Sequence, residues 1–122
     1  MPIITPDAEC RRVELAPAAA LFRSLADPAR LAIVRRLSAG DARVVDLMGE
    51  LGLAQSTVSA HLACLRDCGL VRSRPAGRAS LFSLARPELA ELLGAAEGVL
   101  AATGSAVALC PRYGAEEASG GA

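Results

Sequence analysis

The chain has 122 residues, a length typical of one domain with a hydrophobic core of its own. Hydrophobic residues make up 52% of it but aromatic residues only 2%, so leucine, valine and alanine must fill that core, which favours packed helices over a β-sandwich. Its 13 basic and 13 acidic residues cancel, which excludes a globally basic nucleic-acid-binding protein and leaves only local clusters of positive charge.

The sequence contains no membrane or export signal. No apolar run approaches the roughly 18 residues that a membrane span needs, and residues 1–15 are too polar for a secretory signal. We therefore expect a cytoplasmic protein with no membrane partner. In that reducing compartment, cysteines indicate metal ligands, redox sensors or small buried residues rather than structural disulfides. There are four, without the CxxC spacing of a zinc finger: Cys10, Cys64, Cys68 and Cys110.

The N-terminal third predicts an arm and two helices. Residues 1–15 contain prolines and charges of both signs, and we expect a flexible arm there. A first helix is predicted from about Ala16 to Ala26, with Pro17 in its first turn. Asp27-Pro28 repeats this start signal, with the aspartate as N-cap, and predicts a second helix that ends at residues 38–40.

The next segment has the pattern of a helix-turn-helix. Asp41 is predicted to cap a third helix, in which apolar residues recur at three- and four-residue spacing until Gly52 ends it. Residues 52–54 separate it from a fourth helical pattern within Leu53–Leu70, which Gly69 closes. Two short helices joined by such a turn form the helix-turn-helix pattern, in which the second helix reads DNA.

This reading helix carries two different faces. A stripe at helical spacing, predicted to face the core, consists of Val58, Leu62 and Leu65. The opposite face has only short side chains, with Arg66 at its margin, and its hydroxyl groups and small apolar groups suit close approach to a DNA major groove. That opposite face consists of Ser56, Ser59, Ala60 and Ala63.

Cys64 and Cys68 lie four residues apart on the flank between these two faces. At that spacing on a helix, β-carbons are about 5–6 Å apart. A thiophilic metal that holds thiolates at about 2.3 Å, the zinc value, can bridge them without unwinding the helix. The alternative is that both are small buried hydrophobic residues. His61 lies near them on the helical wheel, and we expect it to pack beside the helix rather than to bind metal.

A β-hairpin is predicted after the reading helix, because strand-like runs at 70–74 and 79–84 flank the turn sequence Pro75-Ala76-Gly77-Arg78. A helix-turn-helix followed by a hairpin is a winged helix, so the predicted fold is mainly α with a small β-hairpin. The hairpin's arginines either contact DNA phosphates or form a solvated edge that prevents aggregation. They are Arg72, Arg74 and Arg78.

Pro87 opens a last helix, which runs to about Ala102 with a wide apolar stripe and few charges. So little polar surface at the end of a small domain predicts a helical interface with a second copy of the chain in a two-fold homodimer. The folded domain is therefore expected to span residues 16–102. Residues 103–122, rich in glycine and alanine, are expected to form a mobile tail that carries Cys110.

These motifs resemble the ArsR/SmtB family of metal-sensing winged-helix repressors over about residues 18–102. The residues that carry the resemblance are LADPAR at Leu25–Arg30, LAQSTVSAHL at Leu53–Leu62 and Gly77-Arg78 in the wing. The resemblance implies a homodimer that binds double-stranded operator DNA through the reading helix and the wing. The positions that it assigns to DNA binding are Gln55, Ser56, Thr57, Ser59, Ala60, Arg66 and Arg78.

The family places its metal sites variably, and two of its sites lack their ligands here. The site on the third helix uses a Cys-x-Cys pair before an aspartate, whereas Arg43 and Val45 precede Asp46. The site on the last helix uses aspartate and histidine ligands, whereas the single histidine of this chain, His61, lies on another helix. What remains resembles the CmtR-like, cadmium- and lead-sensing branch, in which two cysteines at the end of the reading helix join a third from the tail.

That branch implies a metal site formed by Cys64, Cys68 and Cys110, with Cys10 as a candidate fourth ligand or second-site thiol. Thiolates select soft ions, so we expect cadmium or lead as the effector that releases the operator, with arsenite or zinc as alternatives.

Three other functions are weighed against this one. The first is a repressor switched by disulfide formation, between Cys64 and Cys68 or between either of them and Cys110. The spacing of Cys64 and Cys68 on an intact helix is unfavourable for direct bridging, whereas a disulfide from the tail to the helix stays open. The second is an enzyme with a cysteine nucleophile and His61 as base, which lacks an evident orienting group or oxyanion loop. The third is a winged helix that contacts only proteins. We expect a DNA-binding protein and no enzyme.

Overall fold

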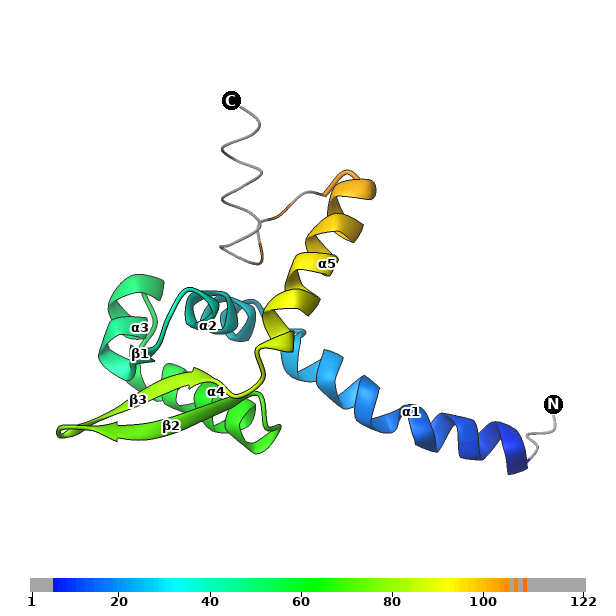
Figure 1. The fold of residues 1–122 in the computed structure, drawn as a ribbon, viewed down its shortest axis with the longest axis horizontal. Helices are drawn as coiled ribbons and strands as arrows, with labels where there is room; N and C mark the ends of the chain where they lie inside the picture. Colours follow the sequence, from blue (N-terminus) through cyan, green and yellow to red (C-terminus); the bar gives the residue numbers. More distant parts are fainter. Residues whose placement is uncertain (1–5, 106, 108, 110–122) are drawn as a thin grey trace.

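A winged helix-turn-helix forms the centre of the computed structural model, which describes residues 6–105, 107 and 109 (Figure 1). The helix-turn-helix is formed by α3 and α4, and the wing is formed by β2 and β3, which confirms the predicted fold class. In chain order the elements are α1 (Pro6–Leu25), α2 (Pro28–Ser38), β1 (Ala42–Arg43), α3 (Val44–Leu51), α4 (Gln55–Asp67), β2 (Val71–Ala76), β3 (Ala79–Leu84) and α5 (Glu88–Ala102).

The elements divide into a body and two outer helices. Figure 1 shows α2, α3, α4 and the sheet gathered together, with α1 extending away from them and α5 rising from the same end of the body. We call α2, α3, α4 and the three strands the body from here on. Within the described residues, no helix is both long and apolar enough to cross a membrane.

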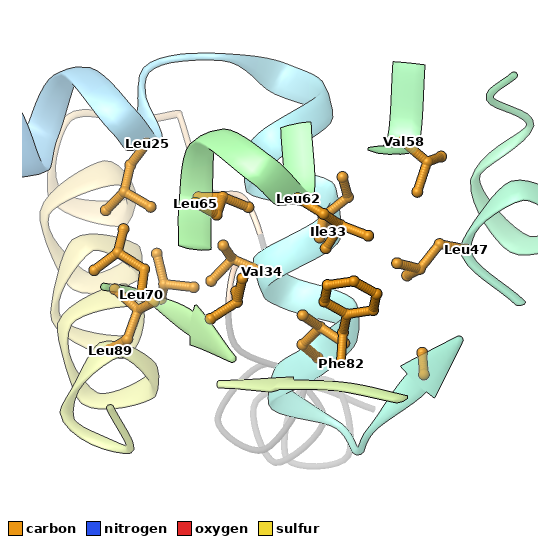
Figure 2. Packing of buried hydrophobic residues seen from close by; sticks show 14 residues of the cluster. Leu25, Ile33, Val34, Leu47, Val58, Leu62, Leu65, Leu70, Phe82 and Leu89 are labelled. Atoms are coloured by element: carbon orange, nitrogen blue, oxygen red, sulfur yellow. The ribbon is translucent and has the colours of Figure 1, made fainter. Parts of the chain in front are cut away.

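The hydrophobic core lies between the helices of the body and its sheet (Figure 2). The predicted stripe of α4, Val58, Leu62 and Leu65, is buried, with at most 1% of each residue exposed. The outer helices each contribute an end to the same cluster, α1 through Leu25 and α5 through its first turns. The buried cluster consists of Leu25, Ile33, Val34, Leu37, Ala42, Leu47, Val58, Leu62, Leu65, Leu70, Val71, Phe82, Leu89 and Leu93.

The start of α2 is set by the predicted cap. The Asp27 carboxylate accepts a hydrogen bond from the backbone N–H of Arg30 at 3.0 Å, and Pro28 occupies the first helical position. This hydrogen bond, which favours the charged carboxylate, lowers the pKa of Asp27 below its usual value.

The predicted start of the first helix at about Ala16 is wrong, because α1 begins at Pro6 and contains Pro17 in its interior. Pro6 followed by Asp7 is a start signal of its own, a proline in the first turn followed by an acidic residue. A proline inside a helix removes one backbone hydrogen bond, and here the alanine-rich helix continues past it. Residues 6–15 of the predicted arm are therefore helical.

The predicted capping of α3 by Asp41 is also wrong. Its N-cap is Arg43, whose backbone N–H donates to the Asp46 carboxylate at 3.0 Å. The Arg43 guanidinium donates to the same carboxylate, and these hydrogen bonds lower the pKa of Asp46. Asp41 instead forms an ion pair with Arg74 of β2, Oδ2 to Nη2 3.2 Å. The residues between, Ala42 and Arg43, form β1, which was not predicted.

The sheet has the strand order β1-β3-β2, with antiparallel pairs throughout. In the wing, Val71 pairs with Leu84 and Ala76 with Ala79, so β2 runs two residues beyond its predicted end at Arg74. Gly77 takes the turn with a φ of +65°, a conformation that glycine adopts without a side-chain penalty. The predicted hairpin is thus confirmed, with a tighter turn than expected.

Candidate functional site

The first turns of α4 present the predicted DNA-contacting residues to solvent. Ser56, Ser59 and Ala60 are exposed, as is Gln55, while Thr57 is half-buried on the adjoining flank. The helix has Ala54 as its N-cap and no side-chain hydrogen bond there, so its first backbone N–H groups face outward without a side-chain acceptor. Uncapped N–H groups at a helix start can bind phosphate, and the short side chains beside them allow close approach.

The arginines predicted to contact DNA are in different situations. Arg66 is exposed in the last turn of α4, and Arg78 is exposed at the tip of the wing, where it has no ion-pair partner among the described residues. Arg74, by contrast, is paired with Asp41 at 3.2 Å. The Nε of Arg72 lies 3.4 Å from the hydroxyl of Ser83. Arg78 is therefore better placed than Arg74 to give its full charge to a phosphate.

One flank of α4 faces the junction between α1 and α2. His61 Nε2 lies 3.8 Å from the Oδ2 of Asp27, so this histidine contacts the cap of α2. Two turns further on, the Sγ of Cys68 lies 3.0 Å from the Oγ of Ser24. The contact between Ser24 and Cys68 was not predicted, because the two residues are 44 positions apart.

Cys64 and Cys68 have the accessibility that metal ligands need. Cys64 is half-buried, Cys68 is exposed, and both thiols are free. The N–H of Cys68 donates to the carbonyl oxygen of Cys64 at 3.1 Å, so the helical turn that joins them is intact. Neither thiol lies in the core, which argues against the alternative of two small buried hydrophobic residues. A pair of soft donors one turn apart suits a thiophilic ion.

Two thiols alone leave a metal site incomplete. Among the described side chains, no three histidine, cysteine, aspartate or glutamate residues lie close enough together to hold an ion. Cys110, the predicted third ligand, lies outside the described residues, as does the side chain of Cys10, whose backbone lies in α1. A third ligand for Cys64 and Cys68 must therefore come from beyond the described side chains of this subunit.

A buried glutamate holds the segment that leads to Cys110. Glu97 of α5 is 5% exposed, and its carboxylate accepts a hydrogen bond from the backbone N–H of Leu109. Leu109 packs on α2 in a small pocket of about 180 Å³. The sequence analysis missed this contact, although a lone glutamate within an apolar stripe was a signal for it. The residues that line the pocket are Pro28, Leu31, Ala32, Arg35, Val107 and Leu109.

This pocket lies on the outward face of α2. With 3.6 residues per turn, positions 28, 31, 32 and 35 lie opposite the positions 33, 34 and 37 that face the core. Leu109 thus packs on the face of α2 opposite its fully buried positions, where Leu31 and Leu109 also adjoin the hydrophobic cluster.

The outer helices leave apolar side chains in solvent. On α1, Val13 is 71% exposed and Phe22 57%, and on α5 Val99 is 65% exposed. Phe22 and α5 together form an apolar groove of about 430 Å³. Its lining residues are Phe22, Leu92, Ala95, Ala96, Val99 and Leu100. Large apolar side chains gathered on one surface in this way mark a protein interface.

Comparison with known proteins places the body in an established family. Residues 27–73, from the cap of α2 into β2, match the family model described as bacterial regulatory protein, arsR family. A relative from Streptomyces lividans, described as a probable mercury resistance operon repressor, is 35% identical over 98 residues. That match covers 80% of this chain and 78% of the relative.

Solved structures agree with this assignment. The crystal structure of Rv0081 from Mycobacterium tuberculosis has a TM-score of 0.69 at 40% identity and covers 72% of this chain and 89% of that one. The solution structure of CmtR from the same organism, described as a cadmium metal-sensor, has a TM-score of 0.55 at 45% identity, with 63% and 80% covered. The homodimeric winged helix-turn-helix DNA-binding domain of Mb0332 from Mycobacterium bovis has a TM-score of 0.66 at 28% identity, with 73% and 82% covered.

Proposed function

The chain belongs to the arsR family of bacterial regulatory proteins, and from this premise we propose that it is a metal-responsive transcriptional repressor. It binds operator DNA as a homodimer and releases it when a thiophilic ion binds Cys64, Cys68 and Cys110. The family consists of regulators, so the protein is not an enzyme. The observation that carries the metal part of the proposal is the pair of accessible thiols one helical turn apart on the reading helix.

Operator binding in this proposal uses the exposed face of α4 and the tip of the wing. Gln55, Ser56 and Ser59 lie near base edges, with Thr57 and Ala60 beside them, and Arg66 and Arg78 lie near phosphates. Exposure of this surface supports the proposal, as does the uncapped start of α4. In the dimer, the two reading helices enter successive major grooves about 34 Å apart, so the operator is pseudo-palindromic. The repressor acts in the cytoplasm.

The dimer interface in this proposal is formed by α1 and α5. The exposed apolar residues of these helices and the groove between Phe22 and α5 support this interface. A second copy of the chain would bury this apolar surface, which is unfavourable to leave in water. The homodimeric Mb0332 domain, a structural neighbour, supports the same assembly. A two-fold axis between the outer helices leaves both reading helices free to face DNA.

The effector in this proposal is cadmium or lead, with arsenite or zinc as alternatives. Thiolate ligands support a soft ion, and the similarity to the cadmium sensor CmtR supports cadmium as the first probe. The third thiol, Cys110, follows Leu109, whose backbone N–H donates to the Glu97 carboxylate. In this proposal Cys110 joins the cysteine pair of its own subunit or that of the partner subunit.

A switch that works by disulfide formation is less well supported. A disulfide needs β-carbons about 3.8 Å apart, whereas residues four apart on a helix place theirs about 5–6 Å apart. The hydrogen bond between the backbones of Cys64 and Cys68 keeps that helical turn closed. Oxidation of this pair would have to unwind the end of α4, whereas metal binding would not.

A cadmium titration followed by ultraviolet thiolate-to-metal absorption tests the proposal. The wild type is expected to give an absorption that saturates at one ion per protomer. Cys64→Ser, Cys68→Ser and Cys110→Ser are each expected to lose roughly a third of that absorption, or tight binding altogether, because each removes one of three thiolates. Cys10→Ser is the matched comparison and decides whether a fourth thiolate is present. Undiminished absorption in both Cys64→Ser and Cys68→Ser would show that the site lies elsewhere.

A further inference from the structure

Helix α1 is anchored to the body at its last turn. Residues 11–20 are exposed on every side, whereas Ser24 and Leu25 are buried and Leu21 is half-buried. A helix of 20 residues is roughly 30 Å long, and Figure 1 shows α1 extending away from the body over most of that length. A small change in the contacts of the last turn is therefore amplified along the whole helix.

The polar contacts of this last turn converge on Ser24. Its backbone carbonyl accepts a hydrogen bond from the Nε of Arg30 at 2.6 Å. Its hydroxyl donates to the carbonyl oxygen of Ala20 at 2.9 Å and lies 3.0 Å from the Sγ of Cys68. Ser24 and Glu97 are the two buried polar side chains among the described residues. Ser24 therefore connects α1 to the end of the reading helix at the thiol that the proposed metal site uses.

The direction of these hydrogen bonds depends on the protonation of the sulfur. A hydroxyl carries one hydrogen, and a carbonyl oxygen can only accept, so the hydrogen of Ser24 goes to Ala20 and the Cys68 thiol donates to the Ser24 oxygen. When a metal–sulfur bond forms, the thiol proton leaves to solvent and the sulfur has no hydrogen to donate. Ser24 must then turn its hydrogen from Ala20 to the sulfur, or the contact with Cys68 is lost.

We propose that Ser24 is a positioning residue that transmits metal binding at Cys68 to the direction of α1. The inference rests on the proposed function and adds the route by which the ion reaches the dimer interface. In the metal-free protein, the thiol holds the last turn of α1 against α4. Ligation of Cys68 removes that hydrogen bond, and the reoriented α1 carries Val13 and Phe22 of the proposed interface with it. The spacing of the two reading helices changes as a consequence.

The first experiment tests the contact in the metal-free, full-length protein. Amide hydrogen exchange is measured for the last turn of α1 in the wild type, Ser24→Ala, Cys68→Ala and the double variant. Each single change is expected to speed exchange about three- to tenfold, the effect of one ordinary hydrogen bond, and the double variant is expected to match the single ones. If the double variant instead shows the sum of the two single effects on exchange, Ser24 and Cys68 do not interact and the inference is overturned.

A matched control separates the thiol contact from the bond within the helix. Ser38 ends α2, and its hydroxyl donates to the carbonyl oxygen of Val34, four residues earlier, at 2.9 Å. Ser38→Ala therefore removes the same kind of helix bond that Ser24→Ala removes, without touching a cysteine. It is expected to speed exchange in the last turn of α2 by less than Ser24→Ala speeds exchange in the last turn of α1, because only Ser24→Ala also removes a contact with a thiol. Equal effects of the two variants, each measured at its own helix end, would mean that Ser24 has only a local structural role.

The second experiment repeats the exchange measurement with cadmium chloride. Cadmium is expected to produce thiolate-to-metal absorption in the wild type, Ser24→Ala and Ser38→Ala alike. It is expected to change exchange in the last turn of α1 in the wild type and in Ser38→Ala, but not in Ser24→Ala. An unaltered response in Ser24→Ala, with the absorption present, overturns the inference alone. If the wild type shows no absorption, both the proposed metal site and the coupling through Ser24 are overturned. The metal-free exchange experiment still tests the contact between Ser24 and Cys68 in that case.

Discussion

The body and the outer helices of this protein differ in where their apolar side chains lie. In the body, the residues of the hydrophobic cluster face one another, and Ile33, Leu47 and Leu65 are fully buried. On α1 and α5, side chains as large as Val13, Phe22 and Val99 remain more than half exposed. One chain is therefore enough to complete the core of the body, whereas the exposed apolar side chains of the outer helices are the surface that the proposed dimer covers.

In the proposed function, the body provides stability and the outer helices provide regulation. The body can present a fixed DNA-reading surface because its core is closed within the subunit. The outer helices can shift relative to the body, because α1 is anchored through its last turn and α5 through its first turns. The cysteine pair lies at the boundary between these two regions, where Cys68 of α4 contacts Ser24 of α1. In the proposed function, the metal ion binds at this boundary between the body and α1.

The largest expected effect comes from the core of the body. Leu62→Ala removes a side chain that is 1% exposed, and we expect the free energy of unfolding to fall by about 2–5 kcal/mol, because the vacated volume is only partly refilled. Urea denaturation at a fixed protein concentration measures it. Val45→Ala, at a position that is 57% exposed in the same body, is the control and is expected to change stability by less than about 0.5 kcal/mol. Equal losses in the two variants would contradict the burial of Leu62 in the core.

The next effect concerns the outer helices. Val99→Asp places a charge in the proposed interface, and we expect the dimer dissociation constant to rise by about 100-fold, because burying an unpaired charge costs several kcal/mol. Sedimentation velocity measures it over a range of concentrations. Val45→Asp, with a similar exposed fraction on the body, is expected to leave the dimer unchanged. A Val99→Asp variant that sediments as the wild type does would remove α5 from the interface.

The smallest effect distinguishes two arginines of the wing. Arg78→Ala is expected to reduce the slope of log affinity against log salt by about one, because one phosphate contact is lost. Arg74→Ala is expected to reduce it by less, since Asp41 already pairs with Arg74 in the free protein. Fluorescence anisotropy on one duplex at several salt concentrations compares them. A larger reduction for Arg74→Ala than for Arg78→Ala would reverse this assignment.

Local signals made the body predictable from its sequence. Asp27-Pro28 specified the start of α2 because cap and proline act within one turn, and the spacing of Val58, Leu62 and Leu65 specified the buried face of α4. The position of Cys64 and Cys68 on one flank of the reading helix was also predicted from helical spacing, and their free thiols from the expected reducing compartment. The family resemblance then supplied the DNA-binding role, which the neutral net charge did not indicate.

Features that depend on distant partners were missed or assigned wrongly. Asp41 has the composition of a helix cap, but its partner is Arg74, 33 positions away. Strand β1 has only two residues, and its pairing with β3 is what defines it. Ser24 is an ordinary helical serine until the fold brings Cys68 to it. Of the predicted flexible arm, residues 6–15 belong to α1. The domain bounds of 16–102 and the mobile tail stay predictions, as does the ligand role of Cys110.

Release of DNA by cadmium tests the central claim most directly. A fluorescent duplex is selected from a random pool by the metal-free protein, and its anisotropy is followed as cadmium chloride is added to the complex. The account predicts that anisotropy falls to the value of free DNA for the wild type, and that Cys64→Ser and Cys68→Ser stay bound at the same cadmium concentrations. Full release from both serine variants, at the wild-type cadmium concentration, would contradict a switch located on the reading helix.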